Sequence, residues 1–394
     1  MRRMTNNVEL AAKLGKRAKT NEPLSKHTFL KIGGPADVYY EAEFSVDFLR
    51  AIMLSRELGI QVTILGDGSN VLVSDKGIRG LVLVNRANEI EILESNKKTK
   101  IDTIKPEYRW ESDSKVGSFK YEFKDLDYDE FDKPRILVKM DSGVDLPRAI
   151  DYLLDKGITG LQWYAGIPGT IGGAVFNNIH GGTHFISEVL NEVAVVDKNG
   201  KEITIPITQL GVDYDKSRFQ SSGEIITSAT FLLYKGDIKK AKYVRYEWAK
   251  RKSIQPRNAP GCAFHNLTQE QKDKLGLPTT SAGFVIEHIL KLTGYSVGDA
   301  AISESHHNFI VNKGGATAKD YLAVMKNIYW RAKKELGIHL VPEIFLLGFD
   351  QEEIQEFLRP ELVAIRKKRA SEIKTIYKDS KKMFGAKQTS SPIE

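Results

Sequence analysis

The chain has 394 residues, a net charge of +7 and a single cysteine. This length allows two or three domains and a large core, while one cysteine excludes an internal disulfide and fits a cytoplasmic setting. From the sequence we expect neither a signal peptide nor a membrane span, because the apolar runs are too short. Part of the positive charge lies in the C-terminal tail, so we expect a solvated tail and no nucleic-acid partner.

The first part of the chain predicts a mixed α+β unit. Hydrophobic periodicity and turn residues predict a helix and loop over residues 5–26, a helix over 44–58, and strands over 38–40, 62–65, 71–73 and 80–85. Residues 91–135 are charged, aromatic and poorly periodic, which indicates an insertion between two strands. Its aromatic side chains form a partner surface or pack on the domain, and packing is favoured because large exposed apolar patches are rare.

The remaining elements follow the same two periodicities. We expect strands over 137–144 and 225–234, a hairpin with an Asn-Gly turn over 193–205, and helices over 146–156 and 241–251. The composition changes near residue 250. Beyond it we expect a loop-rich stretch over 253–266, helices over 281–292 and 318–336, and strands over 308–312 and 340–347. From Asp350 the chain is charged and helix-prone, which indicates a mobile tail.

Two glycine-rich turns are the most informative local feature. One lies within residues 160–177 and the other follows the strand at 62–65. Neither has the Lys-Ser/Thr of a Walker A loop or the G-x-G-x-x-G spacing of a dinucleotide fold. Glycine lets the main chain approach a ligand closely, and free N–H groups bind phosphate. The pair therefore predicts a diphosphate site, against the alternative of two tight structural turns.

Taken in order, the motifs resemble the flavin-dependent UDP-N-acetylenolpyruvoylglucosamine reductases, the MurB family. The matching stretches are residues 27–37, 65–73, 160–177, 214–219, 255–256, 261–264, 281–283, 306–312, 316–318, 342–343 and 348. The resemblance covers residues 5–90 and 136–348, without the insertion and the tail. The chain resembles the shorter subtype, because no segment is similar to the extra tyrosine-bearing substrate loop of the other.

This resemblance implies an α+β fold with three parts. They are a vanillyl-oxidase-like (PCMH-type) FAD-binding domain of two α+β subdomains over residues 1–240 with the insertion 91–135, a smaller α+β substrate domain over 241–348, and a charged helical or mobile extension over 349–394. The implied enzyme is a cytoplasmic, monomeric oxidoreductase of peptidoglycan synthesis. It reduces UDP-N-acetylglucosamine enolpyruvate to UDP-N-acetylmuramate. A hydride passes from NADPH by way of FAD to the enolpyruvyl double bond, and a protein acid protonates the adjacent carbon.

The resemblance also assigns binding residues. The FAD-binding residues are expected in the two turns: Gly66, Asp67, Gly68, Ser69, Asn70, Gly166, Ile167, Pro168, Gly169, Thr170, Gly172 and Gly173. Neither turn carries a lysine or arginine, which main-chain N–H groups do not require. The carboxylate of Asp67 should point away from a phosphate. The expected substrate contacts are Tyr214, Asn266 and His306, and no metal site is expected.

Two residues match the chemical centre of the family. Cys262 stands where relatives usually carry a proton-donating serine, and a thiol is acidic enough to protonate an enolate. Glu343 matches a carboxylate on the last strand that assists protonation. Without the motifs, Cys262 would be read as a small buried hydrophobic residue and Glu343 as part of a surface ion pair.

The chain departs from the family pattern at three places. Asp215 replaces an arginine that contacts the substrate carboxylate, and an aspartate cannot stabilise an anion. Lys216 or Arg218 could substitute from a shifted position, and we prefer Arg218 because guanidinium binds carboxylates bidentately. His265 replaces a lysine, and His180 replaces a glycine. The alternative function is therefore a FAD-binding oxidoreductase or non-catalytic flavoprotein of the same fold, with an altered substrate.

Overall fold

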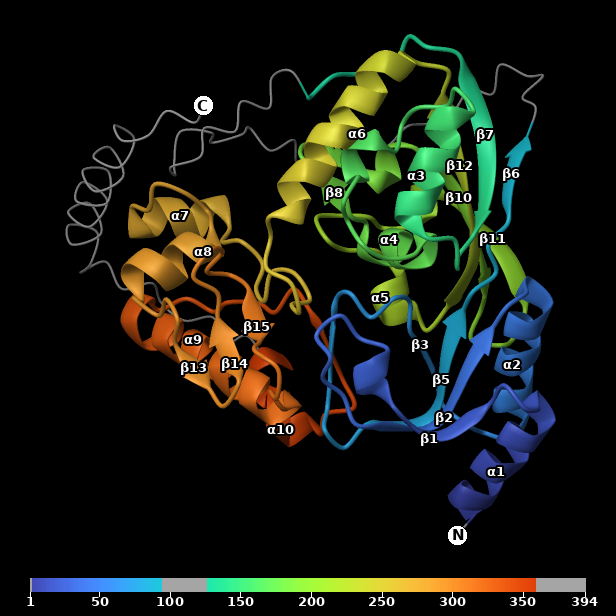
Figure 1. The fold of residues 1–394 in the computed structure, drawn as a ribbon, viewed down its shortest axis with the longest axis horizontal. Helices are drawn as coiled ribbons and strands as arrows, with labels where there is room; N and C mark the ends of the chain where they lie inside the picture. The colour runs from blue at the N-terminus through green and yellow to red at the C-terminus, as the bar shows by residue number, and fades with distance from the viewer. Residues whose placement is uncertain (1, 94–125, 359–394) are drawn as a thin grey trace.

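The computed structural model describes residues 2–93 and 126–358 and contains two sheets, a smaller C-terminal unit and the helices that cover them (Figure 1). The blue N-terminal sheet and the green central sheet lie on one side of the molecule, and the orange C-terminal unit lies on the other. Among these described residues, no helix is long and apolar enough to cross a membrane.

The first sheet has the strand order β1-β2-β5-β3. Its strands are β1 (Lys19–Pro23), β2 (Pro35–Ala42), β5 (Ile78–Asn85) and β3 (Val62–Ile64). Strands β2, β5 and β3 run parallel, and β1 is antiparallel to β2. Helices α1 (Arg2–Leu14) and α2 (Ser45–Glu57) cover one face, because Leu10, Phe48 and Ile52 pack into one buried cluster with Leu81 and Leu83 of β5.

The second sheet is antiparallel, with the order β11-β10-β12-β7-β6. Its strands are β11 (Glu202–Pro206), β10 (Leu190–Val196), β12 (Ile225–Tyr234), β7 (Arg135–Asp141) and β6 (Ile90–Leu93). Helices α3 (Leu146–Asp155), α4 (Ile171–Asn177) and α6 (Ile238–Ser253) pack in its core. Short elements complete this unit: β8 (His180–Gly181), β9 (His184–Phe185) and α5 (Phe219–Ser222). The predicted hairpin is the pair β10–β11.

The C-terminal unit is built around helix α9 (Ala318–Leu336), one face of which is buried. A three-stranded sheet packs against it, formed by β13 (Ser296–Val297), β14 (Ala300–Ile302) and β15 (Ile310–Asn312). Helices α7 (Gln269–Leu275) and α8 (Ala282–Phe284) belong to the same unit, and α8 continues as a π-turn over Val285–Ile289. Helix α10 (Gln351–Leu358) ends the described chain.

The last strand connects the C-terminal unit to the N-terminal part of the chain. Strand β16 (Phe345–Leu347) pairs in parallel with β4 (Val71–Val73), which follows the first glycine loop. Leu30, Ile32 and Leu72 contribute to the C-terminal core. The carboxylate of Asp75 also accepts hydrogen bonds from the first N–H groups of α9, at 2.8 and 3.0 Å. The first glycine loop is therefore fixed against the C-terminal unit by strand pairing, apolar packing and a helix cap.

Helices α6 and α10 lie at the two boundaries expected from the sequence. The buried residues Ala241, Val244 and Trp248 of α6 pack in the core of the second sheet, so a boundary at residue 240 would separate this helix from the core that it joins. The tail was expected to leave the core at residue 349, but Ile354 of α10 is 8% exposed and lies in the C-terminal core. In both places a helix rich in charged residues has a narrow buried face.

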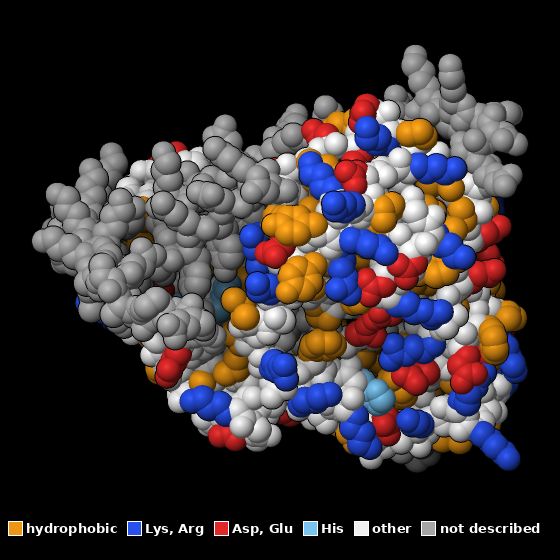
Figure 2. Space-filling model, turned by 45° about the horizontal axis from the view of Figure 1, so that its top comes forward, with side chains coloured by type: hydrophobic (Ala, Val, Ile, Leu, Met, Phe, Trp, Pro, Cys, Tyr) orange, Lys and Arg blue, Asp and Glu red, His pale blue; other side chains and the backbone are white. Residues whose placement is uncertain are grey.

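The insertion is described only at its ends. Residues 94–125 lie outside the described residues, so the expected hairpin and most of its aromatic side chains are not tested. Tyr128 does pack on the domain, with its ring 5.2 Å from that of Trp163 and its hydroxyl accepting from Gln162 Nε2 at 3.0 Å. On the face drawn in Figure 2, basic and acidic side chains are interspersed.

Candidate active site

The two glycine loops contact each other. The Ser69 hydroxyl donates to the Pro168 carbonyl over 3.1 Å. A Cβ added to Gly66 would lie 3.1 Å from Thr170 Oγ1, and one added to Gly169 would lie 3.5 Å from Ser69 Oγ. The loops are nearly one hundred residues apart in the chain, so this contact supports the prediction that they act together.

Main-chain N–H groups in these loops are available to a ligand. Among the described residues, no protein acceptor is bonded to the N–H groups of residues 66–70 and 169–170. The carboxylate of Asp67 lies 2.8 Å from Arg86 Nη1, which neutralises it. Two facing runs of free N–H groups without an unpaired negative charge fit a diphosphate.

Three of the predicted loop glycines have another reason to lack a side chain. A Cβ on Gly68 would lie 2.4 Å from the His27 carbonyl oxygen, and one on Gly172 would lie 2.8 Å from Ser142 Cβ. At Gly166 it would lie 2.7 Å from Lys252 Cβ. These glycines permit close packing between protein segments, whereas a Cβ on Gly169 or Gly173 would make only ordinary contacts, at 3.5 Å from Ser69 Oγ and 3.6 Å from Thr170 Oγ1. Ile167 packs against the core of the second sheet.

Cys262 and Glu343 come together because their segments pair. Phe264 and Pro342 form an antiparallel bridge, and Glu343 N–H donates to the Ala263 carbonyl over 3.0 Å. On the other side, the buried amide of Asn308 bonds both the N–H and the carbonyl of Phe264, at 3.2 and 2.7 Å. The thiol and the carboxyl are thus held by main-chain pairing, so neither depends on a flexible loop for its position.

Burial dominates the ionisation of this pair. Burial, with the charge of Glu343 second, raises the pKa of the Cys262 thiol well above its usual range. Burial and the neighbouring Asp215 raise the pKa of Glu343 in the same direction. Burial therefore favours the neutral, protonated form of both groups.

The first glycine loop touches this pair. Asn70 Nδ2 donates to the Glu343 carbonyl over 3.4 Å, and Phe345 N–H donates to the Asn70 carbonyl over 3.0 Å. The strand pairing of β4 and β16 continues directly from these contacts. A ligand bound by the first loop would therefore lie beside the segment that carries Glu343.

The structure does not bring Arg218 to this pair. Its guanidinium makes two bonds to Glu224, at 3.0 and 2.8 Å, and a third to the Gln209 carbonyl at 3.1 Å. The sequence-based preference for Arg218 as the substrate cation therefore has no geometric support. Lys216 is exposed on the same turn.

The other predicted substrate contacts differ in their surroundings. The ring of Tyr214 lies near two histidine rings, with its centroid 5.1 Å from that of His180 and 6.0 Å from that of His265. Burial lowers the pKa of His306 to about 4, so this ring is neutral at pH 7. Asn266 Oδ1 accepts from Ala282 N–H over 3.1 Å and thereby caps helix α8, which is a structural role that the motif alone did not reveal.

Lys252 is the cation that sequence reasoning missed. It ends helix α6, and its stem packs on Gly166. Burial lowers the pKa of the Lys252 ammonium, and the influence of Cys262 and Glu343 acts in the opposite direction. In the sequence it stands in the run Lys250-Arg251-Lys252, which looks like an ordinary solvated helix end. The only signal was its position just before the loop that carries Cys262.

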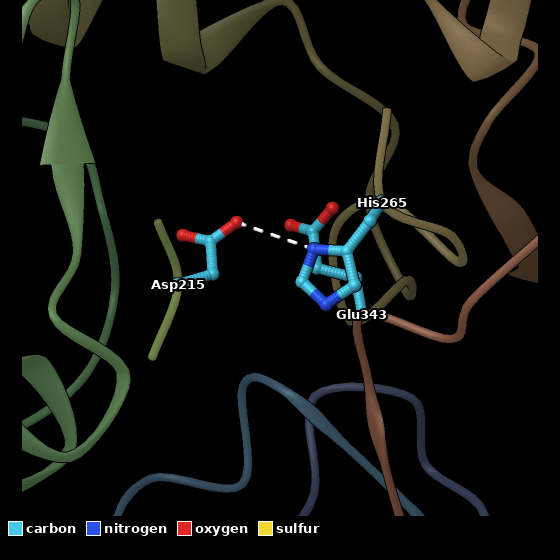
Figure 3. Close-up of side chains that lie close together, drawn as sticks. All are labelled: Asp215, His265 and Glu343. Atoms are coloured by element: carbon cyan, nitrogen blue, oxygen red, sulfur yellow. Dashed lines mark ion pairs between the residues drawn. The ribbon is translucent and has the colours of Figure 1, made fainter. Parts of the chain in front are cut away.

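A second cluster lies beside Glu343. Asp215 and His265 point toward each other, with Asp215 Oδ2 and His265 Nδ1 3.5 Å apart, and the Glu343 carboxyl lies next to the ring (Figure 3). On the other side of Asp215, His180 Nε2 lies 3.8 Å from Oδ1. The three residues at which the sequence departs from the family pattern therefore meet at one place.

Comparison with known proteins identifies the family. A sequence model described as the C-terminal domain of UDP-N-acetylenolpyruvoylglucosamine reductase matches residues 254–347, and one described as an FAD binding domain matches residues 122–206. The reductase of Agathobacter rectalis is 32% identical over 333 residues, which are 83% of this chain and 93% of that protein. The chain belongs to the UDP-N-acetylenolpyruvoylglucosamine reductase family.

Other members of this family agree with that assignment. The reductase of Pediococcus pentosaceus is 31% identical over 329 residues, 83% of this chain and 93% of that protein. The crystal structure of the reductase (MurB) from Thermus caldophilus has a TM-score of 0.60 and 27% identity, and covers 84% of this chain and 99% of that one. The predicted fold, a FAD-binding domain followed by a MurB C-terminal domain, is confirmed. Reductases of this family are FAD- and NADPH-dependent oxidoreductases of peptidoglycan precursor synthesis.

Proposed function

We propose that this chain is an active, cytoplasmic, monomeric reductase of the shorter subtype that converts UDP-N-acetylglucosamine enolpyruvate to UDP-N-acetylmuramate. One observation carries the proposal. The paired glycine loops are joined through Asn70 to the main chain of Glu343, with Cys262 on the neighbouring segment. A diphosphate-binding element and a proton-bearing pair therefore form one continuous site.

The loops would hold FAD through their main chain. Residues 66–70 and 169–170 provide the free N–H groups, and Gly173 borders the same space. When bound, FAD passes a hydride from NADPH to the substrate double bond. Ser69, Asn70 and Thr170 fix the loops to each other and to the last strand, so that the binding surface is formed before a ligand arrives.

Cys262 supplies the proton in this proposal. The substrate carbon next to the site of hydride addition takes the proton from Cys262 Sγ, which leaves a thiolate that regains a proton from water. A neutral thiol is needed at the start of this step, and burial keeps it neutral. In the free protein Glu343 is also protonated and lies beside the thiol, where it can hydrogen-bond the developing enolate oxygen.

Lys252 contacts an anionic group of the substrate in this proposal. Cys262 and Glu343 influence the pKa of its ammonium, whereas the guanidinium of Arg218 is bound to Glu224. A buried ammonium interacts more strongly with an anion than an exposed one, because the surrounding dielectric is lower. Lys252 thus provides a positive charge near the reacting groups, which the guanidinium of Arg218 does not reach.

The second candidate is a flavoprotein of the same fold with another substrate or with no chemistry. Asp215 favours it, because a carboxylate stands where the family carries a cation. The two are separated by following NADPH oxidation by the purified holoprotein with and without UDP-N-acetylglucosamine enolpyruvate. Substrate-dependent oxidation with formation of UDP-N-acetylmuramate supports the reductase. Tightly bound FAD with no substrate-dependent turnover at millimolar substrate would reject it in favour of the second candidate.

A further inference from the structure

The cluster of Asp215, His265 and Glu343 has the composition of a metal site. One side-chain ligand atom from each of the three residues lies within 4.8 Å of the others. They come from three separate segments (Figure 3): a turn, a loop, and the bend just before strand β16. From the sequence we expected no metal site, because these residues belong to separate motifs and only folding brings them together.

The cluster is not held together by hydrogen bonds of its own. Asp215 Oδ2 and His265 Nδ1 are buried and, within the part of the chain that the structure describes, neither has a hydrogen-bond partner. Their separation of 3.5 Å is too long for a good hydrogen bond. It is close to the distance of about 3.4 Å between two ligands that each lie about 2.1 Å from a tetrahedral metal ion.

The main chain around the cluster is rigid. His265 N–H donates to the Val341 carbonyl over 2.9 Å, and Glu343 N–H donates to Ala263 over 3.0 Å, so these two ligands flank the bridge of Phe264 and Pro342. The Asp215 carbonyl accepts from Gln220 Nε2 at 2.9 Å. His180 Nε2 faces the second carboxylate oxygen of Asp215 and can orient it, as outer partners commonly do around metal sites.

We propose that Asp215, His265 and Glu343 bind one divalent transition-metal ion of the zinc type. One imidazole nitrogen and two carboxylate oxygens suit Zn²⁺, and three protein ligands leave one position open. The ion places a Lewis acid where this chain has lost the family's arginine. Asp215, His265 and His180 otherwise look like three unrelated departures from the family motif. With the ion bound, all three serve one purpose, which is to replace the lost arginine.

The role of the ion rests on the proposed function, although its binding does not. The open position would take a carboxylate oxygen of the enolpyruvyl group. With the ion bound, the Glu343 carboxylate is a ligand and Cys262 alone provides the proton. Two carboxylate ligands balance the charge of a divalent ion, so the site would bind the substrate carboxylate through the Lewis acidity of its open position and not through a net positive charge.

The test is direct binding of Zn²⁺ to the FAD-loaded protein. After treatment with a chelator, isothermal titration and elemental analysis should give one Zn²⁺ per chain, and X-ray absorption should show nitrogen and oxygen ligands. Asp215→Asn and His265→Gln should each weaken binding by roughly 10- to 100-fold or more. Asp213→Asn is the matched control, because Asp213 is an exposed acid two residues away and should leave Zn²⁺ affinity unchanged.

The outcomes separate the site from its role. FAD absorbance and the melting temperature of each variant show whether it is folded, and Asp215→Ala provides a second substitution. Absence of stoichiometric Zn²⁺, or equal affinity in folded Asp215 and His265 variants, overturns the site. If Zn²⁺ binds as described but chelated and Zn²⁺-loaded proteins have the same KM for the enolpyruvyl substrate, the site stands and its role in substrate binding is wrong. This binding test remains decisive even if the chain lacks reductase activity.

Discussion

Cys262 can be tested as the proton donor because its step is separable from flavin reduction. In Cys262→Ala, NADPH should reduce the flavin at a near-normal rate, since that half-reaction needs no substrate proton. Reoxidation by the enolpyruvyl substrate should slow roughly 10²- to 10⁴-fold, the usual cost of losing a general acid. Cys262→Ser should recover much of the rate. Stopped-flow flavin absorbance follows both halves, and equal slowing of both would make the residue structural.

Lys252 should control substrate affinity. Removing a charge-assisted contact costs about 1.5–3 kcal/mol, so Lys252→Met should raise the KM for the enolpyruvyl substrate roughly 10- to 100-fold. Lys252→Arg should restore part of it. Lys250→Met is the matched control, since Lys250 is exposed on the same helix turn. Steady-state kinetics decide the question, and a KM unchanged in Lys252→Met would return Arg218 to consideration.

At the scale of elements, the bounds of strongly patterned helices and strands could be predicted from the sequence. The pairing of strands that lie far apart in the chain could not. The bounds of α9 and β12 agree with the sequence to the residue, because one has a clear 3.6-residue pattern and the other is rich in β-branched and aromatic residues. The helix expected over 281–292 is instead the short α8 and a π-turn. The parallel pairing of β4 with β16 joins segments more than 270 residues apart, which no local pattern encodes.

A substitution in the second glycine loop should lower FAD binding without unfolding the protein. Gly169→Asp adds a carboxylate beside free N–H groups, so the flavin content of the purified protein should fall sharply through repulsion of the diphosphate. Gly157→Asp is the control, because Gly157 also has a positive φ, of 77°, and open space around it at the end of α3. Absorbance of released FAD per chain measures the effect, and equal flavin content in both variants would contradict it.

The β8–β9 region predicts a pH dependence of stability. Burial alone would lower the pKa of His184, but its hydrogen bonds to the carboxylates of Asp127 and Glu188 outweigh burial and raise the pKa to about 9. His184 is 7% exposed and stacks on Trp163. Because the folded pKa exceeds the unfolded value of about 6.5, this stabilisation is complete below about pH 6.5 and is lost as pH rises through 9.

The stabilisation amounts to at most about 3 kcal/mol, and less because Asp127 is partly exposed. Urea unfolding of the wild type and His184→Phe should therefore differ most at pH 6 and converge by pH 10. Phenylalanine keeps the stacking on Trp163 and removes the charge. A difference in unfolding free energy that is the same at pH 6 and pH 10 would show that the ion pairs contribute nothing.

At the scale of the whole molecule, the residues that the motifs singled out differ in whether the structure brings them together. The motifs found Cys262 and Glu343, and the structure brings them onto paired segments. The preference for Arg218 failed to find support because nothing local reveals its bonds to Glu224. Lys252 and the Asp215 cluster were not predicted as a centre, since their chemistry comes from tertiary proximity between ordinary segments.

The C-terminal boundary gives the last prediction. Truncation after residue 349 removes α10, including Ile354 in the core, Phe357 against Tyr329, and Glu356 paired with Lys326 at 3.0 Å. Losing two apolar side chains from a packed surface should cost about 2–4 kcal/mol, which lowers the melting temperature by several degrees. The exposed pairs of Lys76 with Asp350 and Glu353 should add little.

Two control variants test whether the loss of stability comes from α10 itself. Truncation after residue 358 keeps α10 and should leave both the melting temperature and the flavin content at their full-length values. Ile354→Ala in the full chain should reproduce part of the loss, because it removes only the buried side chain. Differential scanning calorimetry of the holoproteins measures all three. If the protein truncated after residue 349 has the same melting temperature as the full-length protein, α10 contributes nothing to the stability of the fold. The domain then ends at the boundary expected from the sequence.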